Sequence, residues 1–200
     1  ISELSGKSNV QLQAKKLGLD VSRNFDQVLA SIKSLEKNGL TLENAPGSFE
    51  MLVRKQDESY QPHFTVLNIQ SNVNDLNISS RHNSELCTAT VKVRVKNKIA
   101  HVVEEASGPV DALNLALKKA LTSFFPQVRD MQLTDYKVSI LNPEKASAAT
   151  TRVWLQSGYK QELWATIGCS DNILKASAQA LIDSYQLFLI NFSDFTEGKK

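Results

Sequence analysis

The sequence has few cysteines and no long apolar segment. The first feature argues against thiolate metal and redox sites, and the second argues against a membrane-spanning helix. No run approaches the roughly 18 uninterrupted apolar residues that a membrane-spanning helix needs, and the first residues show no secretion signal. Cys87 and Cys169 lack the Cys-x-x-Cys spacing of thiolate metal sites and redox pairs. We therefore expect a cytoplasmic protein with reduced thiols and no membrane partner.

An initiator methionine is also missing, since the chain opens at Ile1 inside what reads as an ordered motif. We expect the 200 residues to be a piece of a longer polypeptide. Their composition, 42% hydrophobic and 22% charged, is that of an ordinary globular protein with one or two small domains.

The chain has little excess charge of either sign. Its 23 Lys and Arg residues against 21 Asp and Glu residues give a net charge of +2, which does not favour nucleic acid as a partner. A basic stripe, formed by Lys92, Arg94, Lys96 and Lys98, could contact RNA, but it lacks the interleaved aromatic residues of a stacking platform. A solvated strand face is the favoured interpretation, and RNA binding stays an alternative.

Motifs that position a nucleophile, a nucleotide or a metal are absent as well. The sequence contains no Gly-x-Ser-x-Gly, phosphate loop or Gly-x-Gly-x-x-Gly. His63, His82 and His101 never occur at the spacings that place two imidazoles on one side of a helix or strand. We expect no catalytic residue, cofactor or metal site in this chain.

Residues 1–57 show the pattern of a small helical subdomain. Ser22 or Asn24 can cap a helix that Gly39 closes, and Pro46 suits the first turn of a second helix. This segment has little apolar surface of its own, so we expect it to pack on another domain or on a partner subunit.

Residues 60–191 show strand patterns followed by helix patterns, twice. Sliding the chain against itself by sixty residues matches eight positions without a gap, among them Gly108 with Gly168. The interpretation is an α+β fold of two βββα units related by a pseudo-twofold axis, with helices covering one face of each sheet. Residues 192–200 read as a tail.

Each predicted strand-to-helix junction contains a glycine, Gly108 or Gly168, beside an Asp or Asn. Free N–H groups at a helix start favour a carboxylate, and glycine allows close approach, so these features suit a zwitterionic amino acid. The alternative is that the glycines only turn the chain while Ser170, Asp171 and Asn172 cap helices.

Four segments closely resemble the C-terminal part of the isopropylmalate and citramalate synthases. They are GSFEMLVRK at 47–55, GPVDAL at 108–113, DYKV at 135–138 and WATIGCSDNI at 164–173. The resemblance covers nearly the whole chain. SGKSN at 5–9 together with the 47–55 run is more similar to the citramalate branch, because Leu4 stands where isopropylmalate synthases usually have His.

The resemblance implies a helical linker and an allosteric dimerisation domain that binds the end-product amino acid for feedback inhibition. The effector would be isoleucine in the citramalate branch and leucine in the isopropylmalate branch. The parent would be an acyltransferase whose (β/α)8 barrel, absent from this chain, binds a divalent metal and condenses acetyl-CoA with a 2-oxo acid. A homodimer is the implied assembly.

The resemblance also assigns an effector pocket to three groups of residues. These are the helix start at Gly108, Pro109, Asp111 and Ala112, the strand positions Leu133, Tyr136, Val138 and Ile140, and the second junction at Gly168, Ser170 and Asn172. The family's Gly-Asn-Gly-Pro is Ala106-Ser107-Gly108-Pro109 here. That departure leaves open a structural dimerisation module without an effector.

Overall fold

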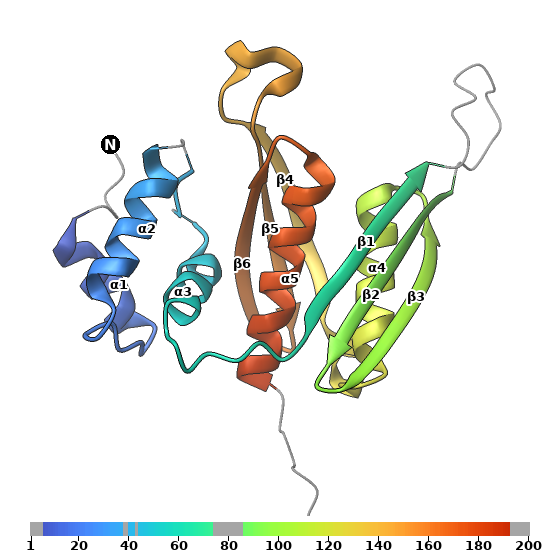
Figure 1. Ribbon diagram of the computed structural model, residues 1–200, viewed down its shortest axis with the longest axis horizontal. Coiled ribbons are helices and arrows are strands. Elements are labelled where there is room, and N and C mark those ends of the chain that lie inside the picture. Colours follow the sequence, from blue (N-terminus) through green and yellow to red (C-terminus); the bar gives the residue numbers. More distant parts are fainter. Residues whose placement is uncertain (1–5, 38–39, 43, 74–85, 193–200) are drawn as a thin grey trace, which may run out of the picture. The chain divides into compact units, whose positions relative to one another are not determined.

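The computed structural model describes residues 6–37, 40–42, 44–73 and 86–192. They fall into two compact units, one drawn from 1–61 and 132–184 and the other from 62–131 and 185–200. Figure 1 gives the element labels used below. Of the predicted tail at 192–200, Phe192 is helical and residues 193–200 lie outside the described residues, as do His82 and Gly39.

The first sheet is antiparallel, has the order β1-β2-β3 and is covered by one helix. Its elements are β1 (Thr65–Val73), β2 (Cys87–Val95), β3 (Lys98–Ala106), α4 (Pro109–Thr122) and the 3₁₀ helix η2 (Pro126–Asp130). Alternate residues of β2, such as Val91 and Val93, are fully buried, as are Ala112, Leu117 and Leu121 of α4. This alternation in β2, with α4 packed on β2 and β3, places polar residues such as Lys92 and Arg94 on the opposite face, together with the exposed Ile99 and Val103 of β3.

The second sheet is antiparallel in the order β4-β5-β6. Its elements are β4 (Gln132–Ile140), the 3₁₀ segment η3 (Pro143–Ala148), β5 (Thr151–Tyr159), β6 (Glu162–Ser170) and α5 (Ile173–Phe192). Hydrogen bonds attach α5 to one face of this sheet: Thr166 Oγ1 donates to the carbonyl of Ala180 at 2.8 Å, and the Trp164 indole donates to Ser184 Oγ at 2.8 Å.

Three helices pack on the other face of the second sheet (Figure 1). They are α1 (Lys7–Lys16), α2 (Phe25–Lys37) and α3 (Pro46–Lys55), and Pro46 begins α3 as predicted. Their core, which includes the buried Ile32 and Phe49, extends to Ile167 of β6. The N–H of Ile167 donates to Ser48 Oγ at 2.7 Å, so α3 occupies the free edge of β6 at this point.

The duplicated βββα pattern is confirmed, but the predicted register is wrong. Equivalent elements start 64 residues apart, at Lys98 and Glu162 for the third strand and at Pro109 and Ile173 for the helix. The two hairpin turns match in conformation as well, since Lys96 and Lys160 have φ of 51° and 55°. The identities at an offset of sixty therefore pair residues four positions out of step.

Candidate functional site

The start of α4 has no side-chain cap. Gly108 is the N-cap residue with φ of −141° and ψ of 154°, and its carbonyl accepts the N–H of Ala112 at 2.9 Å. A Cβ atom at Gly108 would meet nothing within 4 Å. Asp111 lies exposed in the first turn. The glycine is thus not required by backbone conformation or by packing, and the first-turn amides stay open to a ligand.

The start of α5 differs from that of α4, because side chains there accept hydrogen bonds from the first backbone N–H groups of the helix. Asn172 Oδ1 accepts the N–H groups of Leu174 at 2.8 Å and Lys175 at 3.2 Å, which is an N-cap. Ser170 Oγ donates to Asp171 at 2.9 Å and accepts the N–H of Asn172 at 3.2 Å. At this junction the capping interpretation is the one that the contacts support.

Gly168 is not at a strand-to-helix junction, contrary to the prediction. It lies inside β6 opposite Val153, and a Cβ atom there would sit 1.9 Å from the carbonyl oxygen of Ala176. In the second βββα repeat, the residue equivalent to Gly108 is Asn172, not Gly168. The sequence match at sixty residues caused this error, because it equated a helix cap with a packing glycine.

The four predicted residues of β4 lie on the face that α5 covers. Leu133, Tyr136, Val138 and Ile140 pair with Ser157, Leu155, Val153 and Thr151. Tyr136 Oη is 2.9 Å from Ser177 Oγ of α5. Val138 and Ile140 are 42% and 51% exposed, so they offer apolar surface beyond the edge of the helix.

Across this sheet the predicted residues form two short rows. Val138, Val153 and Gly168 are neighbours in one row, and Ile140, Thr151 and Ser170 are neighbours in the next. The structure thus brings the β4 and β6 residues together at one end of one face. Gly108, Pro109, Asp111 and Ala112 belong to the other compact unit.

The compact unit of residues 1–61 and 132–184 contains a cavity that the sequence does not predict. It has a volume of about 640 Å³ and lies where α2 and α3 face β6 and α5. Lys55 Nζ is 2.6 Å from Asp183 Oδ1 at its wall. Burial raises the pKa of Asp183 above the usual range, and Lys55 opposes that rise. The two residues are 128 positions apart, so no local pattern could reveal the pair.

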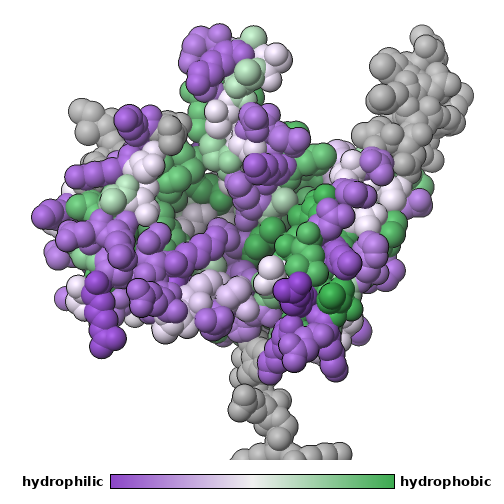
Figure 2. Space-filling view, viewed as in Figure 1, coloured by the Kyte–Doolittle hydropathy of each residue, from purple (hydrophilic) through white to green (hydrophobic). Residues whose placement is uncertain are grey.

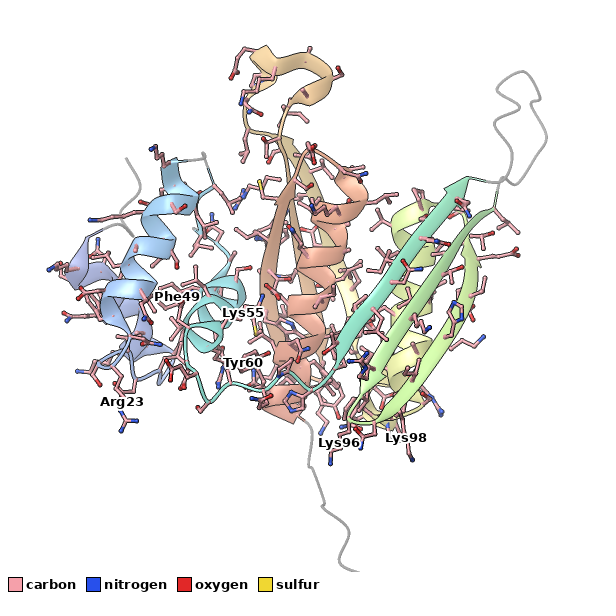
Figure 3. All side chains as sticks on the ribbon, viewed as in Figure 1. Arg23, Phe49, Lys55, Tyr60, Lys96 and Lys98 are labelled. Carbon is pink, nitrogen blue, oxygen red and sulfur yellow. The ribbon has the colours of Figure 1, made fainter. Side chains whose placement is uncertain are left out.

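The basic stripe is spread over a strand and a turn. Lys92 and Arg94 pair with His101 and Ile99 on the sheet face opposite α4, and Figure 3 shows Lys96 and Lys98 at the β2–β3 hairpin. No Phe, Tyr or Trp occurs within β1, β2 or β3. This is the arrangement of a solvated strand face.

The remaining candidates for a metal site are the histidines. His63 donates its backbone N–H to Gln186 Oε1 at 3.0 Å, and His101 is exposed. Among the described residues, no three His, Cys, Asp or Glu side chains gather as a metal site would require. Within the same residues, no helix has both the length and the apolar character needed to cross a bilayer.

Comparison with known proteins gives one family. Residues 45–189 match the LeuA allosteric (dimerisation) domain. The chain is 36% identical to an (R)-citramalate synthase of Geobacter sulfurreducens over its whole length, and 40% identical over 93% of its length to one of Synechocystis. It is 25% identical over 90% of its length to a 2-isopropylmalate synthase of Acetivibrio thermocellus. The chain covers 38%, 35% and 33% of these relatives, so it spans about a third of their length.

Proposed function

The chain belongs to the LeuA allosteric (dimerisation) domain family, and we propose that it is the regulatory part of a cytoplasmic (R)-citramalate synthase that binds isoleucine. The relatives with the highest identity quoted above are citramalate synthases, which supports this branch of the family. The parent would condense acetyl-CoA with pyruvate in a barrel that holds a divalent metal. The described residues offer no metal donor set, so we assign the metal no step in this chain.

The observation that supports an effector site most is the open start of α4. The N–H groups of Val110 and Asp111, which follow Pro109 in the first turn and meet no side-chain cap, would donate to the carboxylate of the amino acid, aided by the positive end of the helix dipole. Asp111 in the first turn would attract the ammonium group. Glycine at a position where a Cβ would touch nothing leaves the main chain approachable from outside.

The apolar part of the effector site is proposed from the resemblance. It assigns Leu133, Tyr136, Val138 and Ile140 to the aliphatic side chain, and the exposure of Val138 and Ile140 is compatible with that role. Discrimination between isoleucine and leucine depends on the position of one methyl group, which is worth about 1–3 kcal/mol in an apolar pocket. Leucine sensing by an isopropylmalate synthase is therefore the nearest alternative.

Regulation would follow from linkage in a homodimer. An amino acid that binds one arrangement of the dimer more tightly than another shifts the population toward the first, and the helical linker would transmit the shift to the barrel. Light scattering coupled to size exclusion tests the assembly, with a mass of twice 22.2 kDa expected. A mass of 22.2 kDa at all concentrations would contradict it.

A thermal-shift screen against the twenty amino acids tests the effector. We expect isoleucine to raise the melting temperature, because a ligand that binds only the folded state stabilises it. A shift with leucine instead, lost in Gly108→Ser, would move the parent to isopropylmalate synthesis.

The second candidate function is a structural dimerisation module without an effector. The start of α5 favours it locally, because Asn172 and Ser170 already satisfy the amides there. No shift with any amino acid would support this module and reject the effector proposal.

A further inference from the structure

The cavity beside α3 has the size and composition of a ligand site, and all of its lining residues belong to the compact unit of residues 1–61 and 132–184. Its volume of about 640 Å³ falls within the range of small-molecule pockets. Its walls come from α2, α3, the strand β6, the helix α5 and the segment before α3. On this part of the surface, apolar residues show in green among hydrophilic ones (Figure 2).

Both charges needed for a zwitterion stand at this cavity. Figure 3 shows Lys55 at the end of α3, and its ammonium contacts Asp183 of α5. The Lys55 side chain is 48% exposed, whereas the Asp183 side chain is only 16% exposed. A half-exposed lysine compensates a desolvated carboxylate incompletely, so an additional ammonium group near Asp183 would be favourable. The remaining N–H groups of the half-exposed Lys55 ammonium can donate to a carboxylate at the same time.

The rest of the lining is apolar with a few neutral hydrogen-bonding groups. The aliphatic members are Leu35, Leu40, Leu42, Leu52, Ile167 and Ile182. Gln56 and Gln179 add carboxamides, and Gln179 Oε1 already accepts the N–H of Cys169 at 3.0 Å. An aliphatic wall next to one pair of opposite charges matches a free amino acid with an apolar side chain better than a sugar or a phosphate ester, which would need several donors.

We propose that this cavity is a second ligand site, which binds a free apolar amino acid with its ammonium on Asp183, its carboxylate on Lys55 and its side chain among the leucines. The ligand would contact α2 and α3 on one side and β6 and α5 on the other. Its binding would therefore strengthen the packing of the helical segment on the second sheet. Of the residues that the resemblance assigns to the effector pocket, the cavity includes Gly168 alone, and it includes none of those at the start of α4, so this proposal does not depend on the effector proposed there.

Isothermal titration of the full chain with leucine, isoleucine, valine, methionine and phenylalanine tests the site. For the amino acid that binds, the corresponding 2-oxo acid and the corresponding amine should each bind at least tenfold more weakly, because each lacks one of the two charges. Asp183→Asn and Lys55→Met should each weaken binding at least tenfold. Lys119→Met, which removes the exposed ion pair with Glu104 in the other unit, is the matched control and should leave binding unchanged.

Alkylation of Cys169 gives a second measurement that needs no variant. Cys169 lines the cavity and is half-buried, whereas Cys87 is buried in the other unit. Burial raises the pKa of the Cys169 thiol, so labelling with iodoacetamide requires mildly alkaline solution. We expect the bound amino acid to slow the labelling of Cys169 at least several-fold and to leave that of Cys87 unchanged.

The two sites can fail separately. Binding that is lost in Gly108→Ser but kept in Asp183→Asn, with Cys169 unprotected, would overturn the second site and support the effector site. Binding that is lost in Asp183→Asn with Cys169 protected, and kept in Gly108→Ser, would do the reverse. No heat from any of the five amino acids at millimolar concentration would overturn the second site.

Discussion

Gly168 and Ala176 lie so close that a Cβ atom on the glycine would be 1.9 Å from the alanine's carbonyl oxygen. The same atom would be 3.0 Å from the backbone nitrogen of Ala180. Both obstacles are helix backbone, which cannot rotate away as a side chain can. Gly168 therefore sets the distance at which α5 packs on β6, and its absence would push the helix outward.

Replacing this glycine should be costly. We expect Gly168→Ala to lower the free energy of unfolding by about 3 kcal/mol, the upper part of the range for overpacking, because the helix must shift. Gly108→Ala is the matched control, with an expected loss of at most about 1 kcal/mol from the poorer N-cap. Urea unfolding of the two variants measures both values, and equal losses would contradict the assigned packing role.

The two helix starts should respond oppositely to changes at the cap. Asn172→Ala removes the acceptor for two backbone N–H groups of α5, and we expect a loss of about 1 kcal/mol. Gly108→Ser adds an acceptor at the start of α4 and should keep or slightly raise stability. Thermal unfolding followed by circular dichroism checks the pair. A stabilising Asn172→Ala would show that α5 does not need this cap.

His63 should make stability fall in mildly acid solution. Burial lowers the pKa of its imidazole below the ordinary 6.5, although a hydrogen bond with Gln186 opposes the shift. The unfolded chain then binds a proton at a higher pH than the folded one. This contribution is present above pH 6.5 and is lost as the pH falls toward and through the folded pKa.

The His63→Gln variant isolates that contribution. We expect the urea midpoint of the native chain to drop more than that of the variant between about pH 7.5 and pH 5.5. Parallel curves for the two proteins would show that His63 does not titrate differently in the folded state.

The contribution of Asp183 to stability should change with pH in the opposite direction to that of His63. Because the pKa of its carboxyl is raised, the folded chain holds this proton to a higher pH than the unfolded chain does. Its stabilising contribution is full below the ordinary aspartate pKa of 3.8 and is lost as the pH rises through the folded pKa. The difference in unfolding free energy, native minus Asp183→Asn, should therefore decrease with rising pH from about 3.5 to 6. An increase over that interval would mean that Lys55 outweighs the burial.

The fold was largely predictable from sequence because its signals are local. Alternation around Val91 and Val93 gave β2, and Pro46 gave the start of α3. Element bounds are harder to predict. The pair Asn97-Lys98 predicts the hairpin turn, which is at Lys96 and Asn97. The run from Tyr136 to Leu141 predicts a strand, and the strand, β4, begins at Gln132. A β-bulge between Leu133 and Asp135 interrupts the alternation that would have marked that earlier start.

The site was only partly predictable, because its features depend on contacts between distant segments. The role of Gly168 is visible only once α5 lies on β6, and the Lys55–Asp183 pair joins residues at opposite ends of the chain. The repeat register failed for a related reason. Identical residues at Gly108 and Gly168 serve different purposes, whereas the equivalent positions Gly108 and Asn172 differ in residue type.

Calorimetric titration of isoleucine into the native chain and into Gly108→Ser shows whether the start of α4 holds the effector. The serine fills the open space at the start of α4 and supplies the missing cap without loss of stability. We expect measurable isoleucine binding to the native chain and at least tenfold weaker binding to the variant. Equal affinity in both proteins, or no binding to the native chain at millimolar isoleucine, would contradict it.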